Sequence, residues 1–119
     1  FDVVGPDGAY EGGVIAPGPQ VALEALVARA AKLPLVECER PKQVIGKTTA
    51  GAMQSGVVIG YGYLIDGIVE AIQRELCPLK YVICTGSGAR CVAEAATKIT
   101  HVEPSLTLQG LRLIAELNP

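Results

Sequence analysis

The sequence is poor in the residues that build common catalytic centres. Its 119 residues include one histidine and no tryptophan. The lone His101 argues against a zinc site made of several histidines and against a Ser-His-Asp triad within one chain. A single histidine is more often structural than catalytic. The sequence also lacks excess positive charge, because ten Lys and Arg face twelve Asp and Glu. We therefore expect no nucleic-acid partner.

The four cysteines form no Cys-x-x-Cys pair. They stand at Cys38, Cys77, Cys84 and Cys91, and their spacing does not resemble a secreted disulfide framework. We therefore predict four reduced thiols in a cytoplasmic protein. The chain also lacks an initial methionine and a signal-like segment. Because its first residues are already typical of a strand, we expect it to be part of a longer polypeptide.

One uncharged stretch is almost long enough to be a membrane-spanning helix. Residues 48–65 carry no charge over 18 positions, whereas a spanning helix needs about 20 mainly apolar residues. Polar side chains and four glycines interrupt this stretch. We therefore predict a buried helix of a soluble protein and no membrane partner.

The composition is that of one folded domain, since half of the residues are hydrophobic and 18% are charged. Strands are predicted at residues 1–4, 10–16, 80–85 and 99–102, with a further short strand at 35–37. Helices are predicted at residues 20–33, 48 or 49–76, 89–96 and 104–118. A hairpin followed by alternating helices and strands indicates an α/β fold with a mixed sheet flanked by helices.

The second predicted helix is apolar on most sides. Ala52, Gly56 and Gly60 recur every four residues and form a ridge of small side chains. Such a ridge allows close packing of another helix, and a helix that is apolar on most sides is buried on most sides. In so short a chain, we expect one of those sides to meet a second subunit.

The strand-turn-helix around residues 81–96 is the first candidate site. Its glycines permit a ligand to approach the backbone, and Gly86-x-Gly88 resembles the start of a dinucleotide-binding fingerprint, with Glu103 as a candidate ribose ligand. Cys91 stands where the third glycine belongs. A lone Gly-x-Gly is weak evidence, and an ordinary tight turn is the more common explanation.

The second candidate comprises the hydroxyls of Thr48 and Thr49, with Gln54 and Ser55 one turn further on. These groups suit either a polar substrate or simple helix capping.

Other polar and glycine-rich positions have simpler interpretations. Gly12 and Gly13 indicate a strand bulge or a close backbone approach, and residues 16–18 form either a nucleotide-facing loop or a break. Asp2 and Asp7 are possible metal ligands, but Asp7 follows proline and precedes glycine, as turn formers do. No carboxylate pair has a spacing that indicates acid-base catalysis. The residues alone thus predict an α/β domain with a nucleotide or dimer surface.

Taken together, eight segments resemble type III pantothenate kinases in their order along almost the whole chain. The segments are residues 1–4, 10–18, 23–26, 31–34, 44–49, 52–56, 101–108 and 110–112. The resemblance implies the C-terminal ribonuclease H-like lobe, residues 1–119, of a two-lobe kinase in the acetate and sugar kinase, Hsp70 and actin superfamily. It implies transfer of the ATP γ-phosphate to pantothenate, the first step of coenzyme A biosynthesis. It also implies Mg²⁺, a monovalent cation (K⁺ or NH₄⁺), and a homodimer formed through the helix at residues 49–76.

The resemblance assigns few site residues to this chain. Thr49 matches a threonine that contacts pantothenate across the dimer, and Thr85-Gly86-Ser87 matches a turn beside adenosine. Ser87 stands where the family usually has glycine, and Thr48 stands where it usually has asparagine. No residue is expected to be a metal ligand or a catalytic group.

The family's catalytic aspartate, first phosphate loop and Asp-x-Gly-Thr motif would all precede Phe1. The first central strand, which carries that last motif, is therefore expected to be missing from the sheet. We expect this chain alone to be inactive. Two alternatives remain: a non-catalytic dimerisation or regulatory module of the same fold, and a dinucleotide-binding domain.

Overall fold

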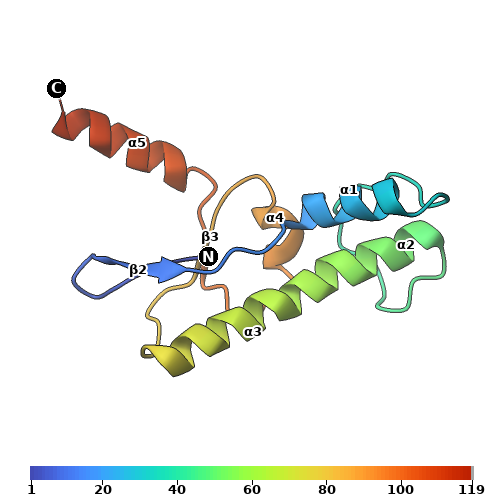
Figure 1. Ribbon diagram of the computed structural model, residues 1–119, viewed down its shortest axis with the longest axis horizontal. Helices are drawn as coiled ribbons and strands as arrows, with labels where there is room; N and C mark the ends of the chain where they lie inside the picture. Colours follow the sequence, from blue (N-terminus) through green and yellow to red (C-terminus); the bar gives the residue numbers. More distant parts are fainter. Residues whose placement is uncertain (119) are drawn as a thin grey trace.

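The computed structural model describes residues 1–118 and has a mixed α/β architecture, as predicted (Figure 1). In chain order the elements are β1 (Asp2–Val4), β2 (Tyr10–Gly13), α1 (Pro19–Arg29), α2 (Thr49–Gln54), the π-helical segment η1 (Ser55–Ile59), α3 (Gly60–Glu75), β3 (Ile83–Cys84), α4 (Ala89–Ala93), β4 (His101–Val102) and α5 (Leu106–Leu117).

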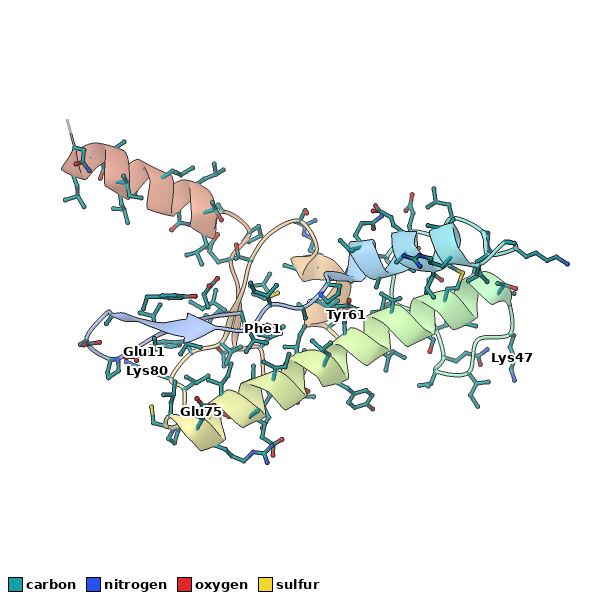
Figure 2. All side chains as sticks on the ribbon, in the orientation of Figure 1. Phe1, Glu11, Lys47, Tyr61, Glu75 and Lys80 are labelled. Atoms are coloured by element: carbon teal, nitrogen blue, oxygen red, sulfur yellow. A yellow bond between two sulfur atoms is a disulfide. The ribbon has the colours of Figure 1, made fainter. Side chains whose placement is uncertain are left out.

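The elements α2, η1 and α3 form one continuous helix from Thr49 to Glu75, and this confirms the long predicted helix. Figure 2 labels Lys47 and Glu75 near its two ends. Its central π-helical turn was not predicted from the sequence. By length and composition this is the one helix within residues 1–118 that could cross a membrane, which is weak support for a spanning role because core helices pass the same test.

The hydrophobic core lies where α1 crosses the first half of the long helix. Leu23 of α1 is fully buried against Met53 and Val57. The Tyr61 hydroxyl adds a polar attachment, because it donates to the Pro17 carbonyl oxygen at 2.6 Å and so holds the segment that enters α1 (Figure 2). Apolar side chains of α1 and of the long helix therefore meet here.

The second half of the long helix packs against the segment around α4. Gly62 is buried beneath the Ala95 backbone, so closely that a β-carbon at Gly62 would collide with it. One turn later, the Asp66 carboxylate accepts hydrogen bonds from the backbone N–H groups of Thr97 and Lys98 at 2.8–2.9 Å and from the Thr97 hydroxyl at 2.7 Å. Asp66 thereby fixes the connection between α4 and β4.

The strands form two separate two-stranded sheets, β1–β2 antiparallel and β3–β4 parallel. A single mixed sheet was predicted, and residues 1–118 do not form one. The strands are also shorter than predicted, and the segment at 35–37 is not a strand. The physical reason is that β1 and β3 each pair along one edge only, and a ladder extends no further than its partner.

The paired glycines of β2 lie at a strand bulge and at a close backbone approach, the two roles that the sequence suggested for them. The register of β1 and β2 shifts between Val3 and Val4. Gly12 has a φ of +123°, and Gly13 lies against the Phe1 carbonyl oxygen, where a side chain would not fit. Glycine is therefore required at both positions.

The helical boundaries also differ from the predictions. The helix α1 ends at Arg29 rather than at residue 33, and α4 ends at Ala93 rather than at residue 96. The Ala30 N–H still bonds to the Leu26 carbonyl oxygen, but Ala30 itself is extended. The chain turns there because Leu33 and Val36 must reach the core on the side of α1.

The fold is open, and α5 extends away from the other helices (Figure 1). The radius of gyration is 16.7 Å, whereas a compact domain of this length has about 13.5 Å. The accessible surface is 8556 Å², against about 6,100 Å² for a compact monomer of this mass. Leucines and isoleucines of α5 contribute to the additional accessible surface, with Ile114 60% and Leu117 80% exposed.

We predict that Asp66→Asn destabilises the protein by about 1 kcal/mol at neutral pH, because the substitution weakens charge-assisted hydrogen bonds. Burial raises the pKa of Asp66, but the hydrogen bonds from Thr97 and Lys98 outweigh it, and the pKa lies below its ordinary value. The stabilisation is therefore fully present above the pKa of the unfolded carboxyl group and is lost as pH falls through the lower folded value. Urea denaturation of both proteins across this pH range measures it.

Asp7→Asn is the matched control, because Asp7 accepts one hydrogen bond, from the Ala9 N–H at 3.0 Å, in an exposed turn. An equal loss of stability in the two variants at neutral pH would contradict the role assigned to Asp66.

Candidate functional site

The structure shows which of the two adjacent threonines caps the long helix. The Thr48 side chain accepts a hydrogen bond from the Gly51 N–H at 3.0 Å and is the helix N-cap. Thr49 is the first helical residue and is exposed, and its hydroxyl forms no hydrogen bond within residues 1–118. Capping therefore explains Thr48 and leaves the Thr49 hydroxyl free for a ligand.

The loop before this helix is attached to it at several points. The Gln54 side-chain amide donates to the Glu37 carbonyl oxygen at 3.1 Å, and the buried Ser55 hydroxyl donates to the Val44 carbonyl oxygen. Gly46 lies directly on the backbone of Ala52, and any side chain there would collide with it. Gln54 and Ser55 thus hold the loop that leads to Thr49.

The turn at residues 85–87 lies between β3 and α4, and all three of its residues are exposed. Gly86 has a φ of +89°, and a β-carbon there would meet no other atom within 4 Å. Glycine is needed at this position for its backbone conformation, and the space beside the turn is open to a ligand. The Ala89 N–H donates to the Gly86 carbonyl oxygen at 3.2 Å, which connects the turn to α4.

The structure does not bring Thr49 and this turn together within one chain. Thr49 lies at the outer end of the long helix, whereas the turn lies near the middle of the molecule beside β3 (Figure 1). A site that used both would require a second copy of the chain or two separate ligand regions.

The acidic candidates have structural roles. The Glu103 carboxylate accepts hydrogen bonds from the Ser105 hydroxyl at 2.6 Å and the Ser105 N–H at 3.0 Å, which lower its pKa. It therefore serves the start of α5 rather than an open ribose site. The Asp2 carboxylate accepts from the Tyr10 hydroxyl at 3.2 Å across the hairpin. Within residues 1–118 no three His, Cys, Asp or Glu side chains converge as a metal site would require.

His101 packs against an aromatic ring rather than against a reactive group. Its ring meets that of Tyr81 edge-on, with 5.4 Å between the centroids, and Nδ1 lies 2.9 Å from the Thr100 hydroxyl. This is the structural role that the sequence favoured.

The structure corrects the prediction of four reduced thiols. Cys38 and Cys91 form a disulfide, with 5.8 Å between their α-carbons, while Cys77 and Cys84 are free. Burial raises the pKa of the Cys84 thiol. The sequence held no signal for the pairing, because the two cysteines are 53 positions apart and only the folded loop brings them together.

The chain is similar to known proteins along its whole length. The family model described as type III pantothenate kinase matches residues 1–71. A type III pantothenate kinase of Roseiflexus sp. (strain RS-1) is 51% identical over 99% of this chain and 46% of the relative. That of Acidiphilium cryptum (strain JF-5) is 48% identical over 100% of this chain and 45% of the relative. The chain thus spans about half the length of the curated relatives it matches.

We predict that Thr48→Ala lowers the free energy of unfolding by about 1 kcal/mol, because the substitution leaves the Gly51 N–H without its cap. Thr49→Ala is the matched variant and should change the stability by less than about 0.5 kcal/mol. Urea denaturation measures both. Equal losses would mean that the two threonines share the capping role.

Proposed function

The chain belongs to the type III pantothenate kinase family, and from this premise we propose that it is the C-terminal half of an enzyme that transfers the γ-phosphate of ATP to pantothenate. This reaction begins coenzyme A biosynthesis. The observation that carries the proposal is the identity of about half of all positions to kinases of this name, spread over the whole chain. The enzyme is expected to act in the cytoplasm.

The chain is proposed to be one ribonuclease H-like lobe whose central strand comes from the preceding half of the protein. Two observations support this. The edges of β1 and β3 that do not pair with β2 and β4 carry no strand within residues 1–118. The surface also exceeds that of a compact monomer by about 2,400 Å², which is the size of a large protein interface.

Thr49 is proposed to bind pantothenate. Its support is the free, exposed hydroxyl at a helix start whose cap is provided by Thr48. A hydroxyl both donates and accepts, and pantothenate offers hydroxyl, amide and carboxylate partners.

The turn Thr85-Gly86-Ser87 is proposed to lie beside the adenosine of ATP. Its exposure and the left-handed Gly86 leave backbone surface accessible. Ser87 stands where the family usually has glycine, and it is exposed.

The parts that perform phosphoryl transfer are assigned to the preceding half. Transfer depends on neutralising charge on the phosphoryl group and positioning the acceptor. Residues 1–118 contain no group of three or more His, Cys, Asp or Glu side chains that could hold a metal ion, so neither Mg²⁺ nor the monovalent cation is assigned to a residue of this chain. The catalytic aspartate is likewise assigned upstream, and this chain supplies binding surfaces.

A homodimer through the long helix is proposed as the active assembly. Positions 56 and 60 of the small-residue ridge are exposed, and a β-carbon there would meet nothing within 4 Å. An open apolar groove of about 590 Å³ runs between α1 and the long helix, and Ala52 and Gly56 line it. Dimerisation would also allow Thr49 of one subunit to face the nucleotide turn of the other.

The decisive experiment compares the full-length protein with residues 1–119 alone in an assay of pantothenate-dependent ADP release. We expect turnover only from the full-length protein, because the phosphoryl-transfer groups are assigned upstream. Absence of turnover in the full-length protein would favour the non-catalytic module, and turnover by the isolated chain would contradict the assignment of catalysis to the other half.

In the full-length enzyme, Thr49→Val should raise the Michaelis constant for pantothenate several-fold and leave that for ATP nearly unchanged. Valine keeps the shape and removes a hydrogen bond that contributes on the order of 1 kcal/mol. Steady-state kinetics with each substrate varied in turn measures the two Michaelis constants. Thr48→Ala is the control for loss of the helix start, and unchanged constants in Thr49→Val would remove Thr49 from the site.

A further inference from the structure

The connection between α1 and α2 links the two candidate binding regions. After α1 it turns back toward α4 before reaching the start of the long helix (Figure 1). Cys38 lies on this connection, half-buried against the core that contains Met53, and Cys91 lies on α4. Their disulfide is the covalent part of the link.

Non-covalent contacts bring the same two segments together. Two residues after Cys38, the Arg40 guanidinium donates to the Glu94 carbonyl oxygen at 2.9 Å, and its Nη1 lies 3.6 Å from the Glu94 carboxylate. The ion pair is exposed and contributes little by itself. Together with the hydrogen bond, it joins the same two segments that the disulfide joins.

A single hydrogen bond connects the neighbourhood of each cysteine to a candidate site. On one side, the Glu37 carbonyl oxygen next to Cys38 accepts from Gln54, on the same helical segment as Thr49. On the other side, the Cys91 N–H donates to the Gly88 carbonyl oxygen at 3.2 Å, directly after the turn that contains Gly86. A bond between Cys38 and Cys91 therefore fixes the Thr49 loop relative to the nucleotide turn.

We propose that Cys38 and Cys91 form a reversible thiol–disulfide pair that sets the affinity of the enzyme for pantothenate; the kinetic part rests on the function proposed above. Disulfides in cytoplasmic proteins are usually transient and redox-responsive, because the thiol pool reduces them. A half-buried pair joining a loop to a five-residue helix suits such reversibility.

The reaction uses a low-molecular-weight disulfide as the oxidant. The thiolate of one cysteine attacks this disulfide, forms a mixed disulfide and releases one small thiol. The second cysteine attacks the protein-bound sulfur, closes the Cys38–Cys91 bond and releases the second small thiol. Two protein thiols are oxidised and one disulfide is reduced to two thiols, which each take up one proton. Excess small thiol reverses both steps.

Closure should lower the Michaelis constant for pantothenate. A loop that is already ordered has less freedom to lose when it binds a ligand, so the same contacts give tighter binding. Opening the disulfide frees the loop near Glu37 while Thr48 still caps the helix, so the folded structure persists. We expect a difference of about threefold in this constant and a smaller change for ATP.

The test equilibrates the full-length protein with mixtures of reduced and oxidised glutathione. Mass spectrometry of tryptic peptides should show residues 33–42 linked to residues 91–98 in the oxidised protein and separate in the reduced protein. The oxidised protein should melt about 5–10 °C higher. Cys38→Ser and Cys91→Ser should abolish both responses, and Cys77→Ser, at a free exposed cysteine, should retain them.

Absence of the linked peptides at every glutathione ratio would overturn the proposal, as would equal pantothenate constants for the two forms. If the full-length enzyme phosphorylates no pantothenate, the proposed kinase function and the affinity claim fail together. The peptide and melting measurements would still decide whether the pair is reversible.

Discussion

Packing against one long helix is the constraint on which the rest of the structure depends. Leu23 of α1 is fully buried against Met53 and Val57 in its first half, and the segment around α4 packs against Gly62 in its second half. Each contact covers one side of the helix only. Because burying apolar surface is the main driving force of folding, the sides left open are where further protein is expected to pack.

The two sheets are small as well. Within residues 1–118, β1 and β2 pair only with each other, as do β3 and β4, and the leucines and isoleucines of α5 are exposed. Sheets of two strands are marginal by themselves. The chain is therefore more open than a compact domain of its length, and it spans about half the length of the relatives it matches.

The sequence predicted those features that depend on local chemistry. The apolar pattern located the long helix, and proline and glycine located the first turn, where Asp7 bonds to Ala9. The strand lengths were wrong because a strand extends only along a partner, and the run at residues 80–85 has one for two residues. The disulfide was missed for a related reason, since the distance between Cys38 and Cys91 is set by the path of a long loop.

In the candidate site, too, some features follow from the local sequence and others from the path of the chain. That a threonine would cap the long helix could be inferred from its position, but which of two adjacent threonines does so depends on where the loop enters. The loop is held by Gln54, by Ser55 and by the close approach of Gly46 to Ala52. These contacts set the backbone of Thr48 as the cap and leave the Thr49 hydroxyl exposed. The loop before the helix therefore decides which threonine hydroxyl is exposed at this end of the helix, and a movement of that loop would change the candidate site.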